Sequence, residues 1–144
     1  MKILTVLTYY RPHTSGLTIY AERLARAFVQ RGHQVTVMTT QYDPSLALEE
    51  MMDGVKVIRV PVASRVSKGL IAPTFGFVAT KLVAQHDVVQ LHLPQFDAPG
   101  VALRARLFGK PVVLTYHCDV QLPQGWFNRL VNSVLDFQND MAGR

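Results

Sequence analysis

The sequence predicts a doubly wound α/β domain, with a mostly parallel sheet and helices on both of its faces. Short runs rich in Val, Ile and Leu, typical of strands buried on both faces, alternate with longer amphipathic runs. The alternation continues to about residue 137 without a linker, a repeat or a low-complexity segment. The length of 144 residues suffices for one domain with a sizeable core.

The first forty residues predict a β-α-β unit. Residues 2–8 are almost wholly apolar, and residues 17–31 carry apolar side chains at helical spacing. The residues at that spacing are Leu17, Tyr20, Leu24, Ala27 and Phe28. Gly32 then follows as a helix-ending glycine does, and residues 34–40 predict a second strand. The two strands are expected to be parallel, with a right-handed crossover.

The middle of the chain is less regular. Residues 41–54 are polar and predict a loop with one helical turn. Residues 55–60 partly alternate and stop at a proline, which predicts a strand near a sheet edge. Residues 63–67 predict a basic loop. The apolar residues 70–83 predict a helix with Pro73 in its first turn.

The last part returns to clear alternation. Residues 87–93 predict a strand, residues 98–108 a helix, residues 112–116 a buried strand, and residues 126–137 an amphipathic helix. The core candidates of the helix over 98–108 are Val101, Leu103 and Leu107.

Composition restricts the class of protein. The chain is 49% hydrophobic and 17% charged, which is typical of a globular domain, and no apolar run approaches the ~20 residues that cross a bilayer. The strand pattern begins at residue 2, so we expect no signal peptide. Cys118 is the only cysteine, which excludes an internal disulfide and indicates the reducing cytoplasm. The net charge of +5 favours anionic partners, but it is too dispersed to predict nucleic-acid binding.

The turn between the first strand and the first helix is a candidate anion site. Ser15 and Gly16 stand immediately before the helix, where free backbone N–H groups and the positive end of the helix dipole suit a phosphate. Gly16 has no Cβ to keep a ligand from the backbone. An ordinary N-cap serine followed by a turn glycine explains the same residues, and the turn alone favours that simpler interpretation.

Polar side chains follow three of the predicted strands. They are Tyr9, Tyr10 and His13 after the first strand, His92 at the end of the strand over 87–93, and His117 and Asp119 after the strand over 112–116. In a parallel sheet these ends meet at one edge, so together they predict a cleft for a polar ligand with an anionic group. Each also has a simpler explanation, such as a buried histidine, an Asx turn or a core tyrosine. His33 and His86 precede strands at the opposite edge, and we assign them no role.

Several site classes are disfavoured. The sequence contains no G-x-G-x-x-G after the first strand, no P-loop motif and no G-x-S-x-G elbow. Cys118 beside His117 lacks the paired C-x-x-C of a zinc site. No acidic pair suited to a glycosidase is evident.

Four segments carry a family pattern in order. Residues 9–17 resemble a first loop with Pro followed by Gly-Gly, with Ser15 in place of the first glycine. Residues 24–37 resemble L-A-x-x-L-x-x-x-G-H-x-V-x-V, residues 87–92 resemble D-V-V-H-x-H, and residues 111–119 resemble P-V-V-x-T-x-H-x-D. Together they resemble the N-terminal domain of the retaining glycosyltransferases of family 4, which have the GT-B fold and use nucleotide sugars.

The resemblance implies a Rossmann-like half of a GT-B fold and a role for each matched residue. It makes His117 the active-site histidine beside the transferred sugar, and Gly16 the glycine whose backbone approaches the donor diphosphate. The resulting assignments are catalysis by His117, donor binding by Ser15 and Gly16, and acceptor binding by Tyr9, Tyr10, His13, His92 and Asp119. No metal or other cofactor is expected, since protein cations can neutralise the diphosphate and no D-x-D pair is present.

The family enzymes have a second domain, which carries an acidic E-x7-E motif and basic diphosphate ligands. We therefore expect residues 1–144 to be the N-terminal, acceptor-side half of an enzyme that transfers a sugar to a saccharide or a lipid-linked acceptor with retention. Alone, this half should be inactive. A stand-alone flavodoxin-like module that regulates a partner is the alternative.

A peripheral contact with the inner face of a membrane is a further prediction. Many family members act on lipid-linked acceptors, and Arg65, Lys68 and the apolar residues 70–77 suit anionic headgroups. A buried helix beside a solvated basic loop explains these residues equally well.

Overall fold

The computed structural model describes residues 1–66, 69–93, 95 and 97–117. Asp119 and the helix predicted over 126–137 therefore lie outside the described residues. The elements are β1 (Lys2–Val6), α1 (Gly16–Gln30), β2 (Gln34–Gln41), β3 (Glu49–Met52), β4 (Val55–Pro61), β5 (Ser64–Val66), β6 (Gly69–Ile71), α2 (Phe75–Gln85), β7 (Val88–Leu93), α3 (Ala98–Leu107) and β8 (Val112–Tyr116).

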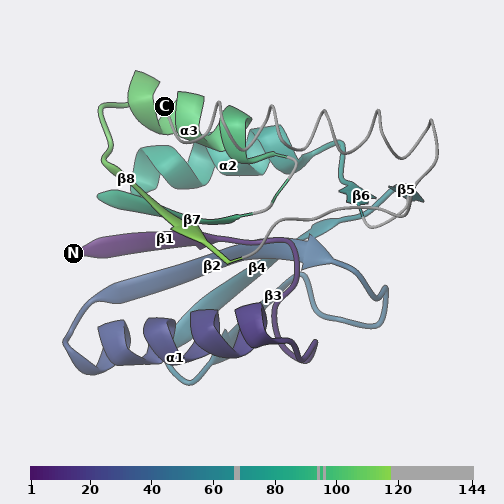
Figure 1. Cartoon of the computed structure of the whole chain (residues 1–144), viewed down its shortest axis with the longest axis horizontal. Coiled ribbons are helices and arrows are strands. Elements are labelled where there is room, and N and C mark those ends of the chain that lie inside the picture. The colour runs from purple at the N-terminus through teal and green to yellow at the C-terminus, as the bar shows by residue number, and fades with distance from the viewer. Residues whose placement is uncertain (67–68, 94, 96, 118–144) are drawn as a thin grey trace.

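A six-stranded sheet with the order β3-β4-β2-β1-β7-β8 forms the centre of the domain (Figure 1). All its neighbouring strands are parallel except β3, which is antiparallel to β4. From β1 the chain moves to β2 and β4 on one side, and it later returns to β7 and β8 on the other. The strand order thus reverses between β1 and β7, which is where open α/β sheets bind ligands. The predicted fold class is confirmed.

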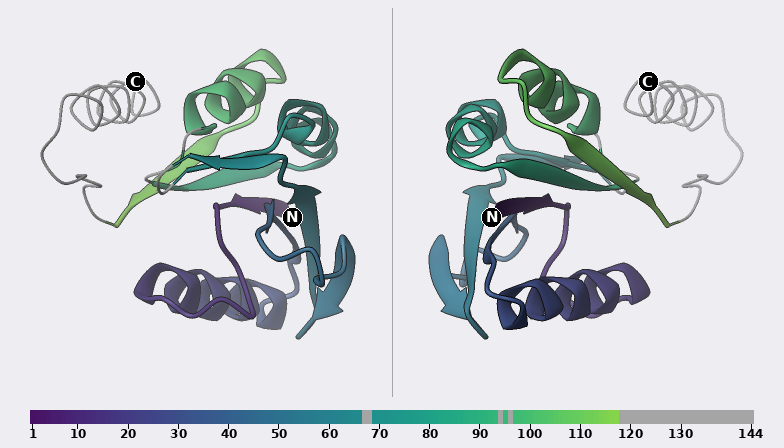
Figure 2. Two further views of the ribbon diagram at one scale, coloured as in Figure 1. Left: turned by 90° about the vertical axis from the view of Figure 1, so that its right-hand side faces the viewer. Right: turned by 90° about the vertical axis from the view of Figure 1, so that its left-hand side faces the viewer.

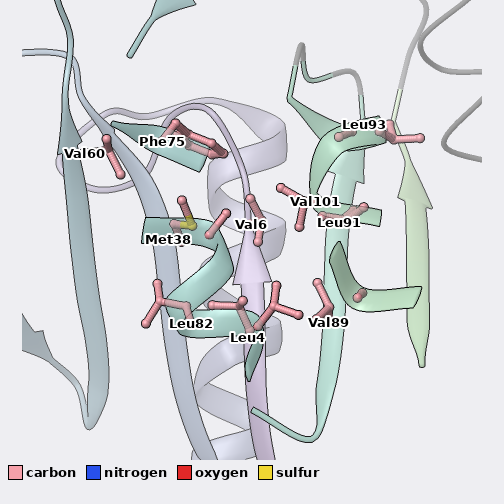
Figure 3. Close-up of a cluster of buried hydrophobic side chains, with 14 residues drawn as sticks. Leu4, Val6, Met38, Val60, Phe75, Leu82, Val89, Leu91, Leu93 and Val101 are labelled. Atoms are coloured by element: carbon pink, nitrogen blue, oxygen red, sulfur yellow. The ribbon is translucent and has the colours of Figure 1, made fainter. Parts of the chain in front are cut away.

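Helices cover both faces of the sheet. Helix α1 lies on one face and helices α2 and α3 lie on the other, as Figures 1 and 2 show. Alternate residues of each strand face the two layers: in β1, Leu4 and Val6 join the core under α2 and α3 (Figure 3), while Ile3 joins the core under α1. Burial on both faces is the reason that β1 is almost wholly apolar.

Local signals set the ends of α1. Ser15 is the N-cap, with φ −152° and ψ 168°, and its Oγ accepts a hydrogen bond from the backbone N–H of Thr18 at 3.2 Å. After the C-cap residue Arg31, Gly32 has φ +87°, the left-handed conformation that glycine adopts without strain. The predicted helix end is confirmed.

Residues 41–54 do not form the predicted loop with a helical turn. They include β3, and the hairpin turn to β4 is made by Asp53 (φ 51°) and Gly54 (φ 79°), as an Asp-Gly pair favours. A Cβ on Gly54 would lie 2.9 Å from Cγ1 of Val29, so the turn packs directly against α1. The placement of β4 near a sheet edge is confirmed, since only β3 lies beyond it.

The segment before α2 also differs from the prediction. Instead of a basic loop over residues 63–67, β5 pairs antiparallel with β6 as a small separate hairpin. Helix α2 begins at Phe75 with Thr74 at its N-cap, so Pro73 lies before the helix rather than in its first turn. No helix in the part of the chain that the structure describes is long and apolar enough to cross a membrane.

Two core predictions near β8 were wrong. In α3 Val101 is buried, but Leu103 and Leu107 are 57% and 77% exposed. The strand β8 was predicted to be buried, yet it is the last strand in the sheet order, and its residues Val113 and Tyr116 are exposed. A short apolar run does not distinguish a central strand from an edge strand.

The face of α1 that is most buried differs from the predicted stripe. Its buried residues are Thr18, Ala21 and Ala25. Leu17 and Phe28 pack only partly buried against that core, and Tyr20 is 47% exposed. Small side chains let the helix approach the sheet closely, so that the larger ones lie at its sides.

Candidate functional site

The carboxyl ends of β1, β7 and β8 meet at one edge of the sheet, where the strand order reverses. These strands are mutually parallel and adjacent, with Leu93 of β7 opposite Tyr116 of β8. The backbone N–H of His117 donates to the carbonyl of Leu93 at 3.2 Å, which fixes the residue after β8 against the end of β7. The predicted convergence of these three strand ends is therefore present in the fold.

Two predicted site residues, His92 and His117, form a pair at this edge. Their facing ring nitrogens, Nδ1 of His92 and Nε2 of His117, lie 2.9 Å apart, within hydrogen-bond distance. The ring planes differ by only 21° and the centroids are 5.2 Å apart, so the rings meet edge to edge through these two nitrogens. The register explains this contact. His92 pairs with Thr115, and His117 follows Thr115 by two residues, so that its side chain lies on the same face of the sheet as that of His92.

The environment of the pair favours its uncharged form. His92 is 1% exposed, and burial together with the nearby ring of His117 lowers the pKa of His92 to about 4. Burial also lowers the pKa of His117 below its ordinary value. Near neutral pH the two rings are therefore hydrogen-bonding groups rather than cations.

Tyr20 brings helix α1 to the histidine pair, a contact that the sequence analysis missed. Its ring lies edge-on, with its centroid 5.2 Å from that of His117 and 6.1 Å from that of His92. Gly16 precedes Tyr20 by four residues, which places it on the same helix face, about 6 Å towards the N-terminus. The N-terminal turn of α1 and the histidine pair therefore share one rim.

The start of α1 offers free backbone donors. Ser15 Oγ is occupied by the N–H of Thr18, at 3.2 Å, and by the Thr18 hydroxyl, at 3.0 Å, so the Ser15 side chain acts as a cap. The first N–H groups of a helix have no intrahelical partner, which leaves those of Gly16 and Leu17 for a ligand. A Cβ on Gly16 would meet no atom of the described residues within 4 Å, so they leave the space in front of this backbone open.

A row of polar side chains runs beneath the histidine pair on the α1 face of the sheet. The Thr5 hydroxyl donates to Gln90 Oε1 at 3.3 Å, and Gln90 Nε2 donates to Thr115 Oγ1 at 3.5 Å. Thr5 and Gln90 are both buried. Hydrogen bonding within the row satisfies polar groups that burial would otherwise penalise.

The first loop carries an aromatic cluster that we define as Tyr9, His13 and Tyr42. The rings of Tyr9 and His13 are stacked with centroids 4.6 Å apart, and Tyr42 lies 5.5 Å from Tyr9 and 5.6 Å from His13. Tyr42 directly follows β2, at the same edge of the sheet. Tyr9 and His13 were predicted site residues. Tyr42 was not, because it stands in a polar segment without a motif.

Tyr10 does not face this edge. It is 1% exposed and belongs to the core under α1, where burial foremost, with a contribution from Glu22, raises the pKa of its hydroxyl to about 12. Its assignment to acceptor binding is corrected accordingly, because a side chain buried in this core is out of reach of a ligand. Tyr9 thus belongs to the aromatic cluster, whereas Tyr10 belongs to the core under α1.

Arg59, at the end of β4, holds the loops together and was also missed. Its buried guanidinium donates to the carbonyls of Arg11 at 2.8 Å and Ala47 at 2.9 Å, and it forms an ion pair with Glu50 at 2.5 Å. An arginine within an otherwise alternating strand is the signal that could have found it. Its hydrogen bonds and ion pair compensate the cost of burying the charge.

The described residues leave the assignment of Asp119 without a structural test, because this residue lies outside them. Within the described part of the chain, no group of three or more His, Cys, Asp and Glu side chains could hold a metal ion.

Comparison with known proteins gives a consistent family. The sequence pattern described as Glycosyl transferase 4-like domain matches residues 15–142. D-inositol 3-phosphate glycosyltransferase 1 from Catenulispora acidiphila is 37% identical over 108 residues, which cover 71% of this chain and 26% of the relative. The chain thus spans about a quarter of that relative's length.

Two solved structures share the fold. Sucrose-phosphate synthase from Thermosynechococcus elongatus matches with a TM-score of 0.60 and 15% identity, over 93% of this chain and 39% of its own. MurG from Acinetobacter baumannii matches with a TM-score of 0.50 and 21% identity, over 92% of this chain and 38% of its own. At these identities the likeness concerns the fold alone.

Proposed function

The chain belongs to the glycosyl transferase 4-like domain family, with the Rossmann-like half of a GT-B fold, and we propose that it is the acceptor-side half of an enzyme that transfers a sugar from a nucleotide sugar. The proposal includes transfer with retention and a second domain that holds most of the donor. The single observation that carries it is the shared rim, where Tyr20 joins the N-terminal turn of α1 to the histidine pair.

This rim suits the leaving group of the reaction. As the bond between the sugar and the diphosphate breaks, negative charge develops on the diphosphate. The free N–H groups of Gly16 and Leu17 and the positive end of the α1 dipole stabilise that charge. Further cations come from the second domain. The Ser15 hydroxyl caps the helix and thereby orders this turn, and it does not bind the donor directly.

His117 holds the sugar beside the diphosphate. Its depressed pKa keeps the ring neutral near pH 7, so it forms a hydrogen bond with the sugar and carries no charge of its own. We assign it no nucleophilic role. His92 is too buried to reach an acceptor, and its contribution is made through His117.

The aromatic cluster forms one wall of the acceptor site. Aromatic faces suit the C–H faces of a saccharide or cyclic polyol, and the cluster lies on the loops that Arg59 fixes. The curated relative is named for D-inositol 3-phosphate, a phosphorylated cyclic polyol. We therefore propose this acceptor class together with saccharides and lipid-linked saccharides.

A fusion protein tests the proposal. The chain replaces the matching N-terminal part of the Catenulispora enzyme, and transfer is measured with a panel of nucleotide sugars and acceptors, including inositol 3-phosphate. Transfer should be detected, and His117→Ala should lower kcat by about 10²-fold. His33→Ala, at the opposite edge of the sheet, is the matched control and should leave kcat unchanged. Undiminished transfer by His117→Ala would reject the site assignment.

The alternative of a stand-alone regulatory module stays open to a simple test. A reading frame that continues for roughly 200 codons, the length of a second domain, supports the transferase. A chromosomal frame that stops after Arg144 supports the module.

A further inference from the structure

Among the described residues, one nitrogen of the buried histidine pair has no partner. His92 is 1% exposed, its Nδ1 faces Nε2 of His117 at 2.9 Å, and its Nε2 is buried without a hydrogen-bond partner in this part of the chain. The titratable rings facing His92 are His117, after β8, and Tyr20, on α1, and no charged side chain contributes to the shift of its pKa. The position of the protons on this pair is therefore decided by the two rings themselves.

Two neutral arrangements place a proton between the facing nitrogens. In the first, His92 donates from Nδ1, so that its unpaired Nε2 is a bare lone pair and His117 carries its own proton on Nδ1. In the second, His117 donates from Nε2, and His92 must then bury an N–H group on Nε2 without an acceptor. An orphaned buried donor is rarer and costlier than an under-used acceptor. The first arrangement is thus favoured.

We propose that His92 is a positioning residue, which donates from Nδ1 to Nε2 of His117 and thereby fixes His117 as the tautomer protonated on Nδ1. The hydrogen bond leaves Nδ1 as the His117 nitrogen that remains for a ligand, and it makes that nitrogen a donor. The small angle between the ring planes lets the N–H of one ring point at the lone pair of the other. His92 itself touches no substrate.

The consequence for the substrate rests on the proposed function. A histidine that presents only a donor suits a lone pair of a sugar hydroxyl or a phosphate oxygen, and it disfavours a ligand that must donate at that point. The site should therefore bind the sugar through an accepting oxygen. The tautomer itself is independent of the reaction, so it can be tested without a substrate.

The chain contains an internal reference for the predicted tautomer. His86 Nδ1 lies 2.6 Å from the carbonyl of Leu82, and its Nε2 lies 2.9 Å from the Thr36 hydroxyl. A carbonyl only accepts, so neutral His86 must carry its proton on Nδ1. Its ring nitrogens therefore give the NMR signature that we expect for His117.

The experiment is ¹⁵N NMR of the ring nitrogens in the whole chain at pH 7.5. For wild type we expect the His117 shifts to match the Nδ1–H pattern of His86. His92→Leu should release His117 to the Nε2–H tautomer that an unconstrained histidine side chain prefers. His92→Asn, whose amide can donate from nearly the same place, should retain the Nδ1–H pattern. The His86 signals serve as the control for the fold in each variant.

Clear outcomes would overturn the proposal. If His117 of the wild type is protonated on Nε2, then His117 is the donor of the hydrogen bond to His92 and the proposal is wrong. This result does not depend on the folding of the variants. An unchanged His117 pattern in folded His92→Leu would show that His92 does not set it. In the fusion enzyme, His92→Leu should lower kcat/KM for the donor by roughly three- to tenfold, with recovery in His92→Asn. Absence of transfer with the expected tautomer would instead reject the proposed function.

Discussion

Acidification from pH 7 to pH 5 should destabilise the domain through His92. The pKa of this residue is about 4 in the fold, against an ordinary value of 6.5. Between these values the unfolded chain binds a proton that the folded chain excludes. Stability is therefore complete above pH 6.5 and is lost as the pH falls towards 4, by about 3 kcal/mol in total and about 2 kcal/mol by pH 5.

Urea unfolding of wild type and His92→Asn at the two pH values measures this effect. The free energy of unfolding should fall between pH 7 and pH 5 by about 2 kcal/mol more in wild type than in the variant. The double difference removes the other titrating groups, such as Asp87, whose lowered pKa affects both proteins alike. Equal pH dependence in the two proteins would refute the burial of a neutral His92.

Three other outcomes follow from the structure. Gly16→Ala should not lower Tm, since the added Cβ meets no atom of the described residues within 4 Å and the replacement of a helical glycine is itself stabilising. It should lower donor kcat/KM about tenfold, and a lower Tm with normal kinetics would contradict the open approach. Arg59→Met should cost about 2–3 kcal/mol in urea unfolding because two part-buried hydrogen bonds and the ion pair with Glu50 are lost, whereas Arg106→Ala, on α3, should change little. The exposed side chain of Phe77 and the basic side chain of Arg65 should contribute to binding of anionic liposomes. Co-sedimentation that is unchanged in the double variant Phe77→Ser, Arg65→Gln would exclude these two residues as a membrane contact.

Most of the sheet could be predicted because its strands are buried on both faces. The apolar runs of β1, β2 and β7 have few other stable arrangements. Residues 49–52 were missed for the opposite reason: β3 pairs only with β4 at the sheet edge, and its Glu and Met residues favour helices. The Asp53-Gly54 pair carried the hairpin signal, but it followed no recognisable strand.

The site was predicted less completely than the sheet. Parallel strands bring His92 and His117 to one edge, but the contact between particular nitrogens depends on the register of β7 and β8. The rotation of α1 about its axis depends on tertiary packing, so the periodicity placed Tyr20 in the core although its ring lies beside the histidines. Likewise, nothing in the pair Tyr9-Tyr10 indicated which ring would be buried.

A crystal structure of the fusion enzyme with a bound nucleotide sugar tests the central claim most directly. The account predicts a diphosphate oxygen within about 3 Å of the Gly16 or Leu17 backbone nitrogen, with Nδ1 of His117 donating to an oxygen of the same ligand. A donor bound productively with either the start of α1 or His117 out of its reach would contradict the claim that they form one site.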